Sequence, residues 1–569
     1  MSPRIISTMK AWSLAALLAL AACGGGGGGS SDTAPPPDAA QGSVSLSFSG
    51  GAPSGVDHVW VTVTAVALHA SADQPWSASD SSWQVVRLDT PVTVDLAALT
   101  NGLVASFLIG QVLPAGDYGQ MRLFIAAPDG QLTEGARQLN LLYNAQVDAT
   151  DSAGAVLHQP LELAQLGLGL RVAGPLHVEA QSNNEITLQL DLQHNLVRLA
   201  GDDGNDRFLL RPDLRPLRLD ATAAIVGLMD KSAFCAPGVR AAGCVHDVVA
   251  SALLPSPDGR FKRVERSAPV TVGQDYAVFA LYPLPENAMV DVVIRGRNMQ
   301  TMVVRAVPAA PADLLHATPT QLGGNPADPK HPVPMVPVVR AEGDAFAAVS
   351  PPLSQPGVQI VFAQTLPGAG ELPLEISSAN LDPFTGLLVH AEPLPSGPLR
   401  VATYSSAAPL SFADVAPAEG SNRFSVASLG TAYQDTSAWK VVDLPAGAST
   451  AITPPDPMAR AGLQSGILHV TLGASPAGVF DAAQLVIADV GGVVAVRDVS
   501  ALLAGGGSLD VDVPAGSNAA ALGGTAVYTV SVRAWKRSAA GTSLRWARAA
   551  APVDMRSALT GSASLSAQP

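Results

Sequence analysis

Residues 185–196 read EITLQLDLQHNL, and the alternation in this stretch decides the fold class. Apolar and polar side chains alternate strictly along it: Ile186, Leu188, Leu190 and Leu192 against Thr187, Gln189 and Asp191. A period of two places each set on its own face of an extended chain, which is the pattern of a half-buried β-strand. Similar stretches recur along the chain, whereas helical periodicity is scarce. We therefore expect an all-β protein.

A repeated turn sequence separates these stretches. It reads LPAGDY at 113–118, LPSGP at 394–398, LPAGAS at 444–449 and VPAGSN at 513–518. Proline fixes one φ angle and glycine supplies a positive φ, so each copy can reverse the chain between two strands. Strands at this spacing predict tandem antiparallel β-sandwich domains, immunoglobulin-like or prealbumin-like, rather than parallel α/β units.

The copy at 113–118 leads into a strand that begins at Tyr118. Simple alternation groups Tyr118 with Gln120, Arg122 and Phe124 on one face, opposite Met121, Leu123 and Ile125. A tyrosine at the start of a strand can bury its ring and still reach the backbone with its hydroxyl, as in a tyrosine corner. We therefore expect Tyr118 to serve folding rather than ligand binding.

The N-terminus has the features of a secretory signal. Arg4 and Lys10 are positive, and Ala11 to Ala22 is almost entirely apolar. Such a run is too short for a bilayer, which needs about 20 residues. Residues 1–22 are therefore predicted to be a signal peptide.

The residues around the predicted cleavage site, Leu20-Ala21-Ala22-Cys23, resemble the lipobox of bacterial lipoproteins. The resemblance implies that Cys23 carries acyl chains such as palmitate, and two or more chains hold a protein stably on a membrane. Gly24, rather than aspartate, implies delivery to the cell outer membrane. It does not decide between the periplasmic face and the cell surface. Residues 23–41, rich in Gly, Ser and Pro, are the expected flexible tether. An ordinary signal with an incidental cysteine is the alternative.

The overall charge limits the partners. The net charge is −14, which disfavours nucleic acid and gives no attraction to anionic lipid. The membrane is therefore an expected partner through acylated Cys23 alone. The length of 569 residues is enough for several domains.

The two remaining cysteines lie close together, in FCAPGVRAAGCV at 234–245. In an oxidising compartment, Cys235 and Cys244 are expected to form a disulfide that closes a turn-rich loop. A zinc half-site is the alternative, but both its usual spacing and a second ligand pair are absent from the sequence.

The first third of the chain contains a distinctive series of stretches. In order, they are GSVSLSFSG, VDHVWVTVTAVALHA, WQVVRL, VTVDLAAL, LPAGDYGQMRLFI, NEITLQLDLQHNLVRL and FLLRPDLRPLRL. In this order, residues 42–220 resemble the bacterial domain-of-unknown-function family 4382. The segment from Pro114 to Arg122 and the terminal Leu-Arg-Pro carry most of the match. The resemblance implies an envelope β-sandwich, often on a lipoprotein, and supplies no established activity or catalytic residue.

The remainder of the chain divides at proline-rich segments. DYAVFALYPLPENAMVDVVIRGRNMQTMVVRAV, within residues 221–316, is similar to the hairpin of prealbumin-like, carboxypeptidase-regulatory-like modules, although Glu286-Asn287 replaces the usual turn glycine. A proline-rich linker at 317–337 precedes a β module at 338–453. A C-terminal β module at 454–554 and a disordered tail at 555–569 complete the expected organisation.

One cluster has ligands suited to a metal ion. GDDGNDRF, at 201–208, offers the oxygen ligands that calcium prefers: Asp202, Asp203, Asn205 and Asp206. The order does not follow EF-hand spacing, and the same residues also make hairpin turns. Calcium is the one cofactor that the sequence suggests.

No catalytic motif is present: the sequence has no G-x-S-x-G, H-E-x-x-H, C-x-x-C or Walker-type loop. The leading hypothesis is a non-catalytic envelope lipoprotein that presents β-sandwich modules for binding or adhesion to a protein, glycan or cell-wall partner. The alternative is a divergent secreted hydrolase or glycan-processing protein with a site assembled from distant loops. A deep pocket with paired carboxylates would favour that alternative.

Overall fold

The computed structural model describes residues 40–565, apart from 52–54, 101, 151–153, 202–204, 212, 237, 312–318, 325–330, 339–342, 349–357, 396, 419, 421–422, 430–433, 436–438, 456–457, 460–463, 476–477, 517–525 and 539–540. The predicted signal peptide, Cys23, the tether up to residue 39, Asp202 and Asp203 lie outside the described residues.

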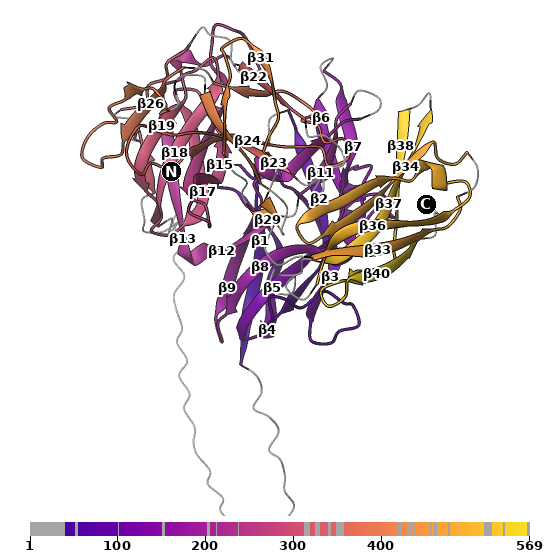
Figure 1. Ribbon diagram of the computed structural model, residues 1–569. Coiled ribbons are helices and arrows are strands. Elements are labelled where there is room, and N and C mark those ends of the chain that lie inside the picture. Colours follow the sequence, from indigo (N-terminus) through magenta and orange to yellow (C-terminus); the bar gives the residue numbers. More distant parts are fainter. Residues whose placement is uncertain are drawn as a thin grey trace, which may run out of the picture. The chain divides into compact units, whose positions relative to one another are not determined.

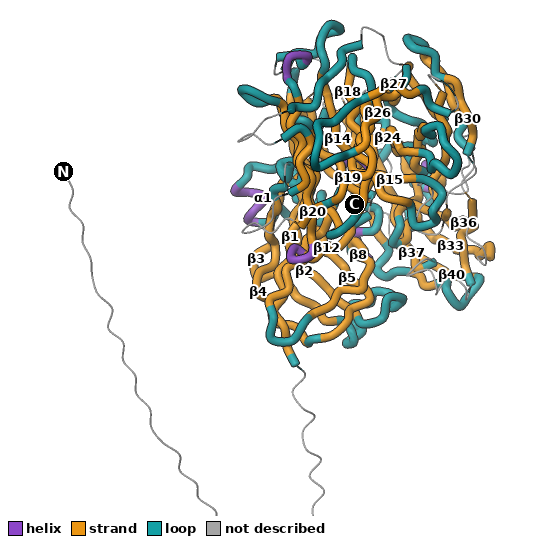
Figure 2. The backbone as a smooth tube through the Cα atoms, turned by 90° about the vertical axis from the view of Figure 1, so that its left-hand side faces the viewer, coloured by secondary structure: helices purple, strands orange, loops and turns teal. Residues whose placement is uncertain are grey.

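The described chain is almost entirely strand and loop, as Figure 2 shows. Helix is confined to short segments: α1 (Glu134–Gln138), α2 (Leu192–Asn195) and the 3-10 turns η1 (Leu166–Leu168), η2 (Leu219–Ala221), η3 (Lys231–Ala233) and η4 (Ser500–Leu502). The all-β prediction is confirmed. Among the residues that the structure describes, no helix has the length and apolar character to cross a membrane.

The N-terminal domain consists of two sheets around one hydrophobic core. The first has the order β12 (Arg215–Arg218), β9 (Asn183–Gln189), β1 (Gln41–Ser49), β4 (Val104–Pro114). The second has the order β10 (Leu196–Leu199), β11 (Arg207–Leu210), β7 (Val156–Glu162), β6 (Gln146–Thr150), β2 (His58–His69), β5 (Gly116–Ile125), β8 (Leu170–Val178), with β3 (Gln84–Asp95) beside β2. Alternation in β1 turns Val44, Leu46 and Phe48 into the core, each about 1% exposed.

Strand β5, which contains Tyr118, departs from simple alternation. The pairing of β5 with β8 shifts register between Tyr118 and Gln120. Tyr118 therefore shares the core with Met121 and Leu123, and the predicted grouping of Tyr118 with Gln120 was wrong. Gly119 permits the shift because a Cβ there would lie 2.5 Å from the backbone nitrogen of Ala72.

Two sheets follow the N-terminal domain, and they do not respect the expected module boundary. The five-stranded sheet contains β16 (Thr271–Val272), β17 (Ala277–Pro285), β13 (Thr222–Met229) and β20 (Ala310–Pro311), with β21 (Thr320–Leu322) beside β13. The ten-stranded sheet has the order β27 (Ala413–Val415), β26 (Leu399–Thr403), β19 (Met302–Pro308), β18 (Met289–Arg297), β14 (His246–Pro255), β15 (Lys262–Pro269), β24 (Leu374–Asn380), β23 (Gln359–Gln364), β28 (Arg423–Leu429), β30 (Lys440–Asp443). Residues 221–316 and 338–453 thus share one sheet, through the parallel pairs β15–β24 and β19–β26.

Two further expectations about this region are corrected. The turn at Glu286-Asn287 does not close a hairpin, because β17 and β18 belong to different sheets; Asn287, with a φ of 59°, carries the chain between them. The predicted linker at 317–337 is partly built into the fold: β21 pairs with β13, and Val333 bridges Met229.

The C-terminal module also has two sheets (yellow in Figure 1) around its own core. One contains β36 (Gly507–Ala515), β33 (Gln464–Leu472) and β40 (Thr560–Leu565); the other contains β35 (Gly492–Asp498), β34 (Ala482–Asp489), β37 (Val527–Ser538), β38 (Gly541–Arg548) and β39 (Val553–Asp554). Small sheets of β25 (Glu392–Leu394), β22 (Gly343–Ala347) and β31 (Ser449–Ile452), and of β29 (Gln434–Asp435) and β32 (Met458–Ala459), lie in the preceding region. Since β40 pairs in parallel with β33, the prediction that residues 555–569 form a disordered tail was wrong for 560–565.

Direct contacts join the N-terminal and C-terminal modules. Leu199 and Leu209 of the first pack with Val486 and Val493 of the second in one apolar cluster. Residues 40–565, as far as they are described, therefore belong to one compact unit.

Candidate binding cavity

A cavity of about 400 Å³ opens where three parts of the chain meet. These parts are the N-terminal domain, the disulfide loop with the neighbouring end of β18, and residues 378–395. Its charged lining is mainly cationic: four arginines, Arg198, Arg240, Arg295 and Arg297, against Asp247 and Glu392, with His390 beside them.

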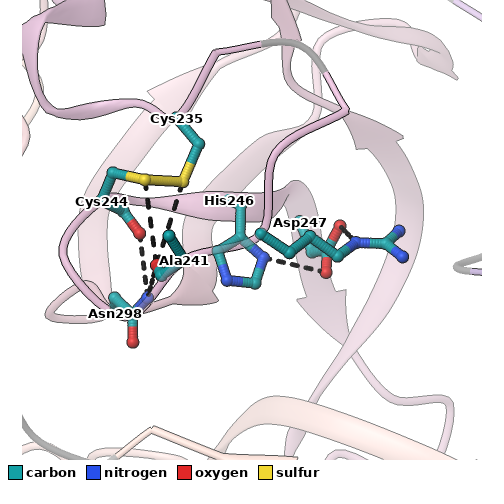
Figure 3. The surroundings of a disulfide bond; sticks show 7 residues. Cys235, Ala241, Cys244, His246, Asp247 and Asn298 are labelled. Carbon is teal, nitrogen blue, oxygen red and sulfur yellow. Dashed lines mark hydrogen bonds and ion pairs between the residues drawn. A yellow bond between two sulfur atoms is a disulfide. The ribbon is translucent and has the colours of Figure 1, made fainter.

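The disulfide loop forms one wall. Cys235 and Cys244 are joined, with their Cα atoms 5.0 Å apart, so the predicted disulfide is confirmed and the zinc alternative falls. Figure 3 shows Asn298 beneath the loop, where its Nδ2 donates to the carbonyl oxygens of Ala241 at 2.8 Å and Cys244 at 2.9 Å. The loop thereby presents Arg240, whose Nε lies 3.3 Å from Asp247 Oδ1.

The end of β18 supplies two arginines. Arg295 and Arg297 alternate with Gly296, so both side chains leave the strand on the same side. Gly296 is required here because a Cβ would lie 2.7 Å from Val248 Cγ2. The pairing with β14 is irregular at this end, and Asp247 has a positive φ of 50° within the irregularity. Such bulges re-aim side chains beside functional sites.

Asp206, one of the predicted calcium ligands, faces Arg198 and His390 instead. Its Oδ2 lies 2.7 Å from Arg198 Nη1 and 2.6 Å from His390 Nε2. Asn205 precedes it in the same loop, and Asp202 and Asp203 lie outside the described residues. No group of three or more metal-ligating side chains occurs among the residues that the structure describes. The arrangement of Asp206 therefore does not support the calcium hypothesis.

A buried ion cluster joins two elements that line the cavity. His194 of α2 lies between Asp191, 2.9 Å from Nδ1, and Glu375 of β24, 3.1 Å from Nε2. Burial alone would lower the pKa of His194, but the charges and hydrogen bonds of both carboxylates outweigh it and raise the pKa to about 10. Asn380 Nδ2 also donates to the His194 carbonyl oxygen at 2.8 Å. This cluster holds α2 and β24, which both line the cavity, in a fixed relation.

The lining does not form a recognisable catalytic set. Its carboxylates each contact an arginine, Asp247 with Arg240 and Glu392 with Arg295 at 3.7 Å. Ser378 Oγ is buried without a hydrogen-bond partner in the described part of the chain, whereas a nucleophilic serine needs an adjacent base. The cavity is suited to holding a ligand by charge and hydrogen bonding.

Sequence reasoning missed the cavity because its residues are far apart along the chain. Arg198, Arg240, Arg295 and His390 are brought together only by the packing of three parts of the chain. The one local signal was Arg295-Gly296-Arg297, two like charges at a strand end.

The comparison with protein families gives one match. Residues 41–212 match the family described as Domain of unknown function (DUF4382). This agrees with the resemblance proposed from the sequence of residues 42–220. No curated protein sequence matches the chain.

Solved structures that resemble the chain include a shaft pilin and a putative adhesin. The shaft pilin SpaA from Lactobacillus rhamnosus GG is 9% identical, with a TM-score of 0.15, over 40% of this chain and 98% of the pilin. A putative adhesin from Bacteroides ovatus ATCC 8483 is 9% identical, with a TM-score of 0.15, over 53% of this chain and 94% of the adhesin. Neither likeness bears on function at this level of similarity.

Proposed function

We propose that this protein is a non-catalytic lipoprotein of the bacterial cell envelope, anchored in the outer membrane through acylated Cys23, that binds a ligand in the arginine-lined cavity. The observation that carries the proposal is the cavity itself, because four arginines and a histidine from three parts of the chain converge on it. Ligand sites in proteins are concave, about 300–1,000 Å³, and carry a few convergent polar groups.

The cavity also separates the two hypotheses left open by the sequence. A glycoside hydrolase needs two carboxylates that flank the scissile bond, one of them as general acid. Here Asp247 and Glu392 each contact an arginine. The lining therefore favours binding over hydrolysis.

The anchor is tested by replacing Cys23 with serine. We expect Cys23→Ser to leave the membrane fraction, because it removes the thiol that accepts the acyl chains. Ser30→Ala, in the same glycine- and serine-rich segment, is the control and should stay in the membrane fraction. Membrane association of Cys23→Ser that still requires detergent for release would overturn the lipoprotein proposal.

Binding without catalysis is tested with envelope material. The purified full-length protein is incubated with soluble glycans and peptidoglycan fragments from the producing cells, and retained compounds are identified by mass spectrometry. We expect a retained compound to be recovered unchanged and to be lost from the Arg295→Gln variant. Recovery of cleaved products would support the hydrolase, and retention of nothing would contradict a binding function.

A further inference from the structure

We infer that the cavity takes a short anionic oligosaccharide, held through its carboxylate or phosphate groups. The inference rests on the proposed function, since it names the ligand class of that same cavity. It comes from the charge, the donor geometry and the neutral lining of the cavity.

The charge of the lining is opposite to that of the protein. The chain as a whole carries −14, yet the described lining has four arginines against two carboxylates. Arginine stays charged at any physiological pH and matches carboxylate and phosphate geometry with two parallel N–H donors. A concave site of one sign concentrates ligands of the opposite sign.

The arginines approach from different sides. Arg198 comes from β10, Arg240 from the disulfide loop, and Arg295 from the end of β18. Arg240 uses Nε for Asp247 and Arg295 uses Nη2 for Glu392. Because a guanidinium has five N–H donors, one carboxylate contact does not exhaust either arginine. This arrangement suits a ligand with more than one negative group on its edge.

The neutral part of the lining suits hydroxyl groups. Gln193, Ser378 and Asn380 supply amide and hydroxyl groups, and the buried Oγ of Ser378 has no partner within the described chain. No Trp, Tyr or Phe is among the described lining residues, so a ring-stacking platform for an uncharged sugar is not available there. Anionic groups with hydroxyls between them are the composition of an acidic sugar.

Asp206 occupies the position of a competing anion. Its Oδ2 contacts both Arg198 and His390, which line the cavity, although Asp206 itself is not part of the lining. An incoming oxyanion must share these two partners with it. Removing this negative charge while keeping the side-chain size should therefore strengthen anion binding.

The experiment is calorimetric titration of the full-length protein with three probes: digalacturonate, its uncharged dimethyl ester, and pyrophosphate. We expect digalacturonate to bind more tightly than the ester, with an affinity that falls as salt is added. Arg295→Gln and Arg297→Gln should each weaken binding about tenfold, the loss expected for a charge-assisted hydrogen bond. Asp206→Asn should strengthen it, and the exposed control Arg545→Gln should leave it unchanged.

The outcomes separate this inference from the proposed function. Tighter binding of digalacturonate than of pyrophosphate supports the inference, because pyrophosphate carries more charge but lacks the sugar hydroxyls. Tighter binding of pyrophosphate overturns the assignment to a sugar and leaves a site for a free phosphate anion. Equal binding of digalacturonate and its ester overturns the inference, as does binding of none of the probes. A retained envelope compound without negative charge would overturn it too, while leaving the binding function intact. Thermal unfolding of each variant shows that it is folded, and the opposite effects of Asp206→Asn and Arg295→Gln cannot both arise from misfolding.

Discussion

Arg533 of the C-terminal module and Glu162 of the N-terminal domain form a buried ion pair, although they are 371 residues apart in sequence. Nε of Arg533 donates at 2.8 Å and Nη2 at 2.9 Å to the two carboxylate oxygens, and the side chains are 9% and 1% exposed. The guanidinium also lies 4.5 Å from the ring centroid of Phe384. Arg533 of the C-terminal module thus contacts both the N-terminal domain, through Glu162, and the region between the two, through Phe384.

Breaking this pair should loosen the C-terminal module. Glu162→Gln keeps the shape but removes the carboxylate that pairs with the buried Arg533, and breaking a buried pair in this way costs about 3–5 kcal/mol. We expect faster hydrogen exchange in β34 and β37. The control is the same change in the exposed pair Glu134–Arg137, Glu134→Gln, which should have no measurable effect. Unchanged exchange in Glu162→Gln would show that the pair does not hold the module.

Tyr118 should be a stability residue. Its ring is 6% exposed, and its hydroxyl donates to the carbonyl oxygen of Pro114 at 2.9 Å. Tyr118→Phe loses one hydrogen bond, about 1 kcal/mol, and Tyr118→Ala loses about 3 kcal/mol or more because a cavity remains. Thermal unfolding should rank the melting temperatures as wild type, Phe, then Ala. An Ala variant that melts with the wild type would mean that the ring contributes nothing to folding.

The ion cluster around His194 predicts that the stability of the fold depends on pH in the alkaline range. The folded protein raises the pKa of His194 to about 10, against about 6.5 when unfolded. Its contribution to stability is therefore complete below pH about 6.5 and is lost as the pH rises through about 10. Chemical denaturation between pH 6 and 10 should show this decline in the wild type. His194→Gln should flatten it, and the exposed His177→Gln should not.

The carboxylates of the His194 cluster predict how the stability of the fold changes at acidic pH. Burial opposes ionisation of Asp191 and Glu375, but pairing with His194 and nearby arginines outweighs it, so both pKa values lie below their ordinary range. Their stabilisation is present above pH about 4 and is lost as the pH falls through the lowered values. Glu375→Gln should therefore reduce the loss of stability on acidification, measured by the same denaturation series. An acid limb identical to that of the wild type would contradict this.

The disulfide should survive cleavage inside its loop. Trypsin cuts after Arg240, and without reductant the two products should remain one species in mass spectrometry because Cys235 and Cys244 are joined. Closing so short a loop stabilises the fold by about 2–3 kcal/mol in the chain-entropy model, so the reduced protein should unfold more easily. Two separate peptides before reduction would show that the bond is absent.

Local sequence patterns predicted the features that depend only on residues close together in the chain. Strict alternation predicted the strand β9, although β9 ends at Gln189 and Leu192 begins the short helix α2. The nine-residue spacing of Cys235 and Cys244 predicted their bond. The position of Tyr118 was missed because the register shift at Gly119 depends on contact with Ala72, far from the strand. The β-class follows from local periodicity, whereas the exact face of a residue follows from its partner strand.

The features that were missed depend on long-range pairing. The shared ten-stranded sheet depends on the parallel pairs β15–β24 and β19–β26, each of which joins segments about a hundred residues apart. Asp206 was assigned to calcium because its partner His390 lies 184 residues away. No local composition rule contains such information, so the cavity could be recognised only in the folded chain.

The parallel pairing of β33 with β40 has a mechanical consequence. The register runs from Ile467 beside Thr560 to Leu472 beside Leu565, and these are the first and last long strands of the C-terminal module. A force that pulls the start of β33 and the end of β40 in opposite directions acts along the strands. It therefore loads all the hydrogen bonds between them together, in shear, instead of opening them one at a time. The module should therefore resist extension most strongly along that line.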